Sequence, residues 1–192
     1  MMTDHKDDPP PSDDSEVFAL GTERTPPLSE THPHLKEFMA FLEEFNRETP
    51  RGAALAAAAF LDNLLGRIIS AFLIPNDSGF ALTNGFNAPL GTLAAKIAAC
   101  HAMGLISEAE YKECTLVRKI RNEFAHEVHV SFKDDRVRSL CASLTMSAKP
   151  YPGVTVDTRG QFTSAAVCLI VNLTNRPHYV AQKELKYGNW KI

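Results

Sequence analysis

Apolar residues recur at helical spacing through most of the chain after residue 34. Between His34 and Glu48 they stand three and four residues apart, at Leu35, Phe38, Met39, Leu42 and Phe45. This spacing gathers them into one stripe on an α-helix. We therefore predict an amphipathic helix over residues 34–48.

A second helix is predicted over residues 50–74. Thr49 is a suitable N-cap residue, and Pro50 suits the first helical position. The segment is rich in alanine and apolar on nearly every side, so we expect it to be the central helix of the fold. Asp62, Asn63 and Arg67 interrupt the apolar run, which favours a buried helix over a membrane span.

A loop over residues 75–88 is predicted from its Asn, Asp, Ser and Gly content. A third helix should start at Pro89 and end near Gly104, a suitable glycine for the position after a helix. Ser107 and Glu110 have the spacing of a capping box. They indicate the start of a fourth helix that runs to about Val128.

The remaining pattern predicts a short helix over residues 134–144 and a loop over 145–160, with a small extended piece at 154–156. A last helix should run from about Gln161 toward Leu185, broken or kinked at Pro177. We find no internal repeat and no useful strand alternation. The fold class is therefore all-α, a single-domain helical bundle around the central apolar helix.

The two ends of the chain differ in composition. Residues 1–33 are acidic and proline-rich, which is typical of a flexible arm, and they lack the basic and apolar regions of a signal peptide. Residues 34–192 form the predicted all-helical domain. The cysteines at 100, 114, 141 and 168 have no metal-binding spacing, so we interpret them as reduced core thiols of a cytoplasmic protein. We expect no cofactor and no metal ion.

A polar cluster interrupts the fourth predicted helix in the stretch RKIRNEFAHEV, residues 118–128. On a helical wheel Arg118, Asn122 and His126 follow one another at four-residue steps along one flank. Arg121 falls between that flank and the apolar face, so we expect it to point partly inward. An inward guanidinium requires a partner.

Asp62 is the candidate partner because it is the only acidic residue between Glu48 and Asp77. A carboxylate in so apolar a segment needs donors. We predict a structural clamp in which Asp62 pairs with Arg121 or Arg118. The same cluster also permits a functional interpretation. His126 could transfer a proton, an arginine could hold a phosphate, and Asn122 could orient a ribose hydroxyl or the imidazole. These three functions suffice for metal-free RNA cleavage by the 2′-hydroxyl.

The spacing Arg121-Asn122-x-x-x-His126 resembles the R-N-x-x-x-H motif of the HEPN superfamily. That group is helical and includes many metal-independent ribonucleases. Its arginine and histidine form the catalytic pair and usually face a groove between two subunits. The resemblance implies catalytic roles for Arg121, Asn122 and His126 if this chain is a ribonuclease.

A broader resemblance covers residues 43–144. The segments RETPRGAALAAAAFLDNLL, NAPLGTLAAKIAACHAMGLISEAEYKECTLVRKIRNEFAH and FKDDRVRSLC resemble the mannitol operon repressor (MltR-type) family. This resemblance implies an all-helical, dimer-forming transcriptional regulator without a recognised DNA-binding motif. The chain itself shows no helix-turn-helix with an exposed basic second helix and no zinc finger, and its net charge is −3.

Two functions therefore stay open. The first is a regulator of the mannitol operon repressor type that acts mainly through protein contacts, with Asp62, Arg118 and Arg121 as a structural clamp. The alternative is a HEPN-type endoribonuclease, a toxin or defence component, with RNA as its partner. In both cases we expect a homodimer. We do not expect direct DNA binding or membrane insertion.

Overall fold

The structure is a computed structural model that describes residues 35–190. The predicted arm at residues 1–33 lies outside the described residues. From residue 35 to residue 190 the regular structure is entirely helical, without strands. The predicted all-α class is confirmed.

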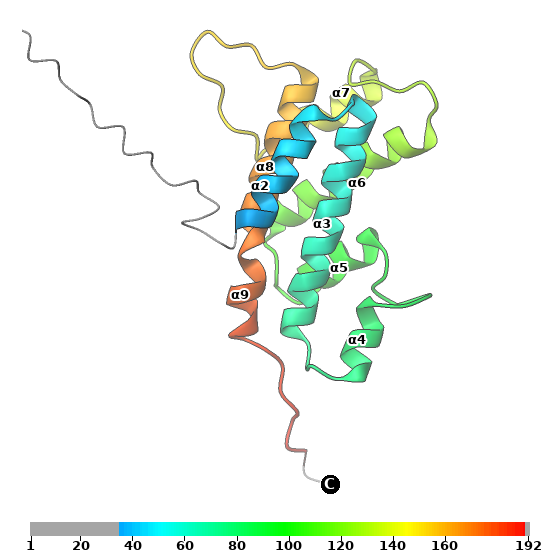
Figure 1. The fold of residues 1–192 in the computed structure, drawn as a ribbon, viewed down its shortest axis with the longest axis vertical. Coiled ribbons are helices and arrows are strands. Elements are labelled where there is room, and N and C mark those ends of the chain that lie inside the picture. The colour runs from blue at the N-terminus through cyan, green and yellow to red at the C-terminus, as the bar shows by residue number, and fades with distance from the viewer. Residues whose placement is uncertain (1–34, 191–192) are drawn as a thin grey trace, which may run out of the picture.

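The helix α3 (Pro50–Phe72) is the centre of the bundle, as predicted. Thr49 caps it, since its hydroxyl accepts a hydrogen bond from the Gly52 amide at 3.0 Å. Helices α2 (Lys36–Arg47) and α8 (Thr158–Thr174) pack against α3 and against each other, as Figure 1 shows. By length and composition α3 could cross a membrane, but here its buried side chains form the core of the bundle.

Two further helices pack against α3. They are α5 (Leu93–Ala102) and α6 (Glu108–His126), which contact α3 and each other. Alanines at positions 53, 54, 57 and 58 are buried, so neighbouring helices can come close to the α3 backbone. The predicted capping box begins α6, because the Ser107 amide donates to Glu110 Oε2 at 2.7 Å and the Glu110 amide to Ser107 Oγ at 3.2 Å.

The prediction of a loop over residues 75–88 is partly wrong. This segment contains the short helix α4 (Asp77–Thr83), which Asn76 caps by accepting a hydrogen bond from the Gly79 amide at 2.8 Å. Polar residues that suggest a loop also make good helix caps, so composition alone could not separate the two. The next helix, α5, begins at Leu93 instead of Pro89, because Thr92 is its cap. It ends as expected, with Gly104 at a positive φ of 68°.

The last part of the chain follows the prediction closely. Helix α7 (Asp135–Ala142) occupies the predicted short helix. The final helical segment is divided before Pro177 into α8 and α9 (Arg176–Ala181), as the missing amide and ring of proline require. The extended piece expected at residues 154–156 is not a strand.

The cysteines lie mostly in the core. Cys100, Cys114 and Cys141 are buried, Cys168 is half-buried, and all four are free thiols. Burial raises the pKa of both Cys100 and Cys141 to about 12. Burial also raises the pKa of Cys114. These three thiols stay protonated near neutral pH, and their burial fits an interpretation as core residues.

Candidate functional site

A groove of about 620 Å³ lies between α3, the start of α5, and α6. It collects most of the residues that the sequence marked as chemical candidates. Its lining consists of Leu55, Ala58, Ala59 and Asp62 from α3, residues 91–94 at the start of α5, and Arg118, Arg121 and Asn122 from α6. We call this set of residues the basic groove.

The two arginines enter the basic groove from the same side of α6. Arg118 is half-buried, and within residues 35–190 its side chain has no hydrogen bond or ion pair. Arg121 is exposed and donates from Nη1 to Asn122 Oδ1 at 3.1 Å. The expectation that Arg121 points inward is wrong. The buried face of α6 contains Val117, Ile120 and Phe124. Residue 121 lies outside this face and lines the open groove, where water solvates the guanidinium.

Asp62 has a different partner from the one predicted. Its Oδ2 accepts a hydrogen bond from Lys96 Nζ at 2.7 Å, and among the described residues it forms no ion pair with Arg118 or Arg121. Helix α5 packs directly along α3, and the Lys96 side chain lies against Gly66. This packing places Lys96 Nζ beside the Asp62 carboxylate. The other oxygen, Asp62 Oδ1, is buried and has no hydrogen-bond partner.

His126 lies apart from the groove lining. It is the last residue of α6 and is exposed to solvent. Positions five residues apart on a helix are rotated by about 140° around its axis, so Arg121 and His126 leave α6 in different directions. The structure thus brings Arg121 and Asn122 together with Arg118, and leaves His126 outside the cavity of this chain. The catalytic roles of Arg121, Asn122 and His126 stay a prediction.

The start of α5 contributes backbone groups to the groove. The Thr92 hydroxyl accepts a hydrogen bond from the Ala95 amide at 3.2 Å. The other amides of the first turn, at Leu93 and Ala94, have no partner within the helix because helical bonding begins one turn later. The positive end of the helix dipole also lies here. The sequence suggested a helix in this region but not that its first turn would face Arg118 and Arg121.

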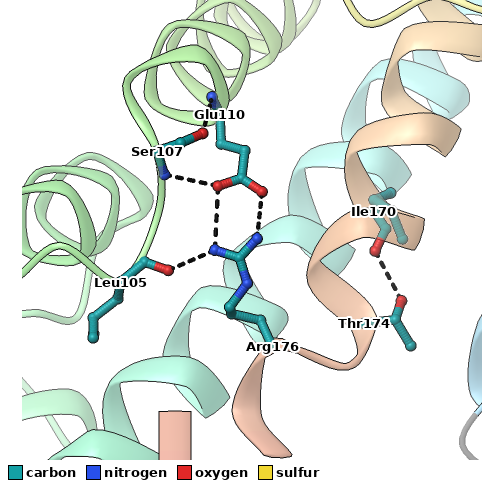
Figure 2. A network of polar contacts seen from close by, with 6 residues as sticks. All are labelled: Leu105, Ser107, Glu110, Ile170, Thr174 and Arg176. Carbon is teal, nitrogen blue, oxygen red and sulfur yellow. Dashed lines mark hydrogen bonds and ion pairs between the residues drawn. The ribbon is translucent and has the colours of Figure 1, made fainter. Parts of the chain in front are cut away.

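Sequence reasoning missed the partners of two buried carboxylates in the described part of the chain, Glu110 and Glu113. Figure 2 shows Arg176 bound to Glu110: Nη2 donates to Oε1 at 2.6 Å and Nη1 to Oε2 at 3.2 Å, and Nη1 also reaches the Leu105 carbonyl at 2.8 Å. The sequence identified Glu110 as a capping residue but carried no signal for its long-range partner. Glu113, also buried, accepts hydrogen bonds from the amides of Thr145 and Met146 at 3.0–3.1 Å.

Within residues 35–190 no three His, Cys, Asp or Glu side chains are grouped so that they could hold a metal ion.

The fold places the protein in the class of all-helical bundles. It is similar to a solved structure. That structure is the X-ray structure of the MtlR-HPr complex from Escherichia coli. The sequence identity is 18%, the TM-score is 0.55, and the likeness covers 74% of this chain and 97% of the other. At this identity the likeness establishes a shared fold. No protein-family model and no curated protein matches the sequence.

Proposed function

We propose that this protein is a regulator that acts through protein contacts, and that its partner is HPr or a protein similar to HPr. The observation that carries the proposal is the fold likeness to a chain in the structure of the MtlR-HPr complex. The likeness extends over 97% of the matched chain. The sequence resemblance to the mannitol operon repressor family over residues 43–144 supports the same assignment. We further propose that the protein is cytoplasmic and forms a homodimer. Light scattering would measure the mass of the dimer.

The experiment is isothermal titration of the full chain with HPr, both from Escherichia coli and from the source organism. Binding heat and co-elution with a one-to-one composition are the expected results. A small acidic protein unrelated to HPr serves as the control. Absence of heat with either HPr at near-millimolar protein concentration would contradict the proposal.

A ribonuclease of the HEPN type is the second candidate. The observation in its favour is the Arg121–Asn122 hydrogen bond, which lies beside Arg118 in the basic groove. In this chain the nuclease needs His126 to approach the groove of a second subunit, because its own groove does not include that residue. Incubation with total RNA tests the candidate. Fragments with cyclic phosphate ends that disappear in His126→Ala would support it, and intact RNA in both samples would rule it out.

A further inference from the structure

Among residues 35–190, no acidic group balances the positive charge of the basic groove. Its only acidic lining residue, Asp62, is already paired with Lys96. In the part of the chain that the structure describes, neither Arg118 nor Arg121 has an acidic partner within ion-pair distance. The two guanidinium groups therefore give the groove about two positive charges that no acidic group among the described residues neutralises.

The opposite wall of the groove strengthens this field. The first turn of α5 lines it with Leu93 and Ala94, whose amides are not used in helical hydrogen bonds. Two guanidinium groups on α6 thus face a helix N-terminus across one cavity. Both kinds of group donate hydrogen bonds, and both favour an oxyanion.

We propose that the basic groove binds the phosphate group of a small phosphate monoester. Such a group carries a charge of about −1.5 to −2 near neutral pH, which matches the unbalanced charge of Arg118 and Arg121. Its oxygens accept hydrogen bonds from guanidinium forks and from helix N-terminal amides. Leu55, Ala58 and Leu93 supply an apolar wall for the rest of the ligand. The cavity volume also falls within the range of about 300–1,000 Å³ that is common for small-molecule sites.

A single-stranded RNA fits the same groove less well. Recognition of single strands uses aromatic side chains on which bases stack, and the groove lining contains none. Each phosphodiester of RNA carries a single charge, so two adjacent arginines exceed what one phosphate of the strand requires. The basic residues are also confined to one short stretch of α6 instead of following a track along the surface.

The test is a titration of the full chain with three probes: glycerol 3-phosphate, inorganic phosphate and a single-stranded RNA oligonucleotide. Glycerol 3-phosphate should bind and should shift the backbone amide resonances of Leu93 and Ala94. The double variant Arg118→Gln, Arg121→Gln should weaken this binding about tenfold or more, the loss expected for charge-assisted hydrogen bonds. Arg138→Gln is the matched control, because Arg138 is exposed on α7 and among the described residues pairs only with Asp135. Its affinity should equal that of the wild type.

Several results would overturn the proposal. They are absence of glycerol 3-phosphate binding, equal binding by the double variant, tighter binding of inorganic phosphate than of the ester, or arginine-dependent binding of RNA that exceeds that of the ester. If the double variant fails to fold by circular dichroism, Arg121→Gln and the amide shifts in the wild type decide the question. The site is independent of HPr, so a failed titration with HPr leaves this test unaffected.

Discussion

Arg176 and the arginines of the basic groove carry the same side chain in opposite circumstances. Arg176 is held by both oxygens of the buried Glu110 carboxylate and by the Leu105 carbonyl. Arg118 has no such partner among residues 35–190, and Arg121 contacts only the neutral amide of Asn122. Figure 2 shows the first guanidinium held by the Glu110 carboxylate and the Leu105 carbonyl.

The difference separates stability from recognition. A charged pair that is largely buried and held by several hydrogen bonds joins distant parts of the chain, here α6 and α9. Loss of one partner then leaves the other charge without its counterion. A guanidinium that faces an open groove contributes little to folding, because water solvates it. It keeps its donors for a ligand. Four variants test this contrast, from the largest expected effect to the smallest.

Glu110→Gln should have the largest effect. A neutral amide cannot balance the Arg176 guanidinium, whose surroundings are largely buried, so we expect the free energy of unfolding to fall by about 3 kcal/mol. Chemical denaturation followed by circular dichroism measures it. Glu44→Gln, at an exposed position on α2, is the control and should change stability by less than about 0.5 kcal/mol. A loss below about 1 kcal/mol at Glu110 would show that the pair is not a structural clamp.

Glu113→Ala should cost about 2 kcal/mol of unfolding free energy. The Glu113 carboxylate accepts hydrogen bonds from the Thr145 and Met146 amides, and alanine leaves these donors unsatisfied beneath the end of α7. The same denaturation experiment measures the loss. Hydrogen exchange at the two amides should also accelerate more than the global change in stability requires, and unchanged exchange there would contradict this account.

Lys96→Met tests the ion pair at the floor of the groove. The Asp62 side chain is 34% exposed, so solvent screens part of the lost attraction, and we expect a loss of about 1 kcal/mol. A double-mutant cycle with Asp62→Asn isolates the pairwise energy from the packing of the Lys96 stem. A coupling energy of zero would mean that the two residues do not interact in solution.

The double variant Arg118→Gln, Arg121→Gln should have the smallest effect on stability, within about 0.5 kcal/mol, because no acid is left unpaired when these charges are removed. Thermal denaturation in low and high salt measures it. A large loss of stability would place these arginines with Arg176 and would remove the contrast between the two regions.

Local chemistry explains which parts of the fold could be predicted. The caps at Thr49 and Ser107, the positive φ at Gly104 and the break before Pro177 depend on a few neighbouring residues, and the sequence displays them directly. The short helix α4 was missed for a related reason. Asn76 belongs to the residue types that favour both turns and caps, and seven helical residues are too few to show a periodic pattern.

Long-range partners could not be predicted in the same way. Asp62 was identified correctly as a carboxylate that needs a donor, but the choice of Lys96 over two arginines depended on how α5 lies along α3. Arg121 was expected to point inward because the wheel of α6 does not show which of its flanks another helix covers. Residue 121 faces the open groove, so its desolvation never occurs.

By itself, the sequence determined the all-helical class, the central position of α3, the main helix ends and the presence of a polar cluster on α6. These features follow from periodicity and from hydrogen bonds between residues close along the chain. Only the tertiary structure decided that Lys96 neutralises Asp62, that Arg176 clamps Glu110, and that Arg118 and Arg121 face the first turn of α5 across a groove. The reason is that charge pairing depends on distance in space, which the packing of helices sets.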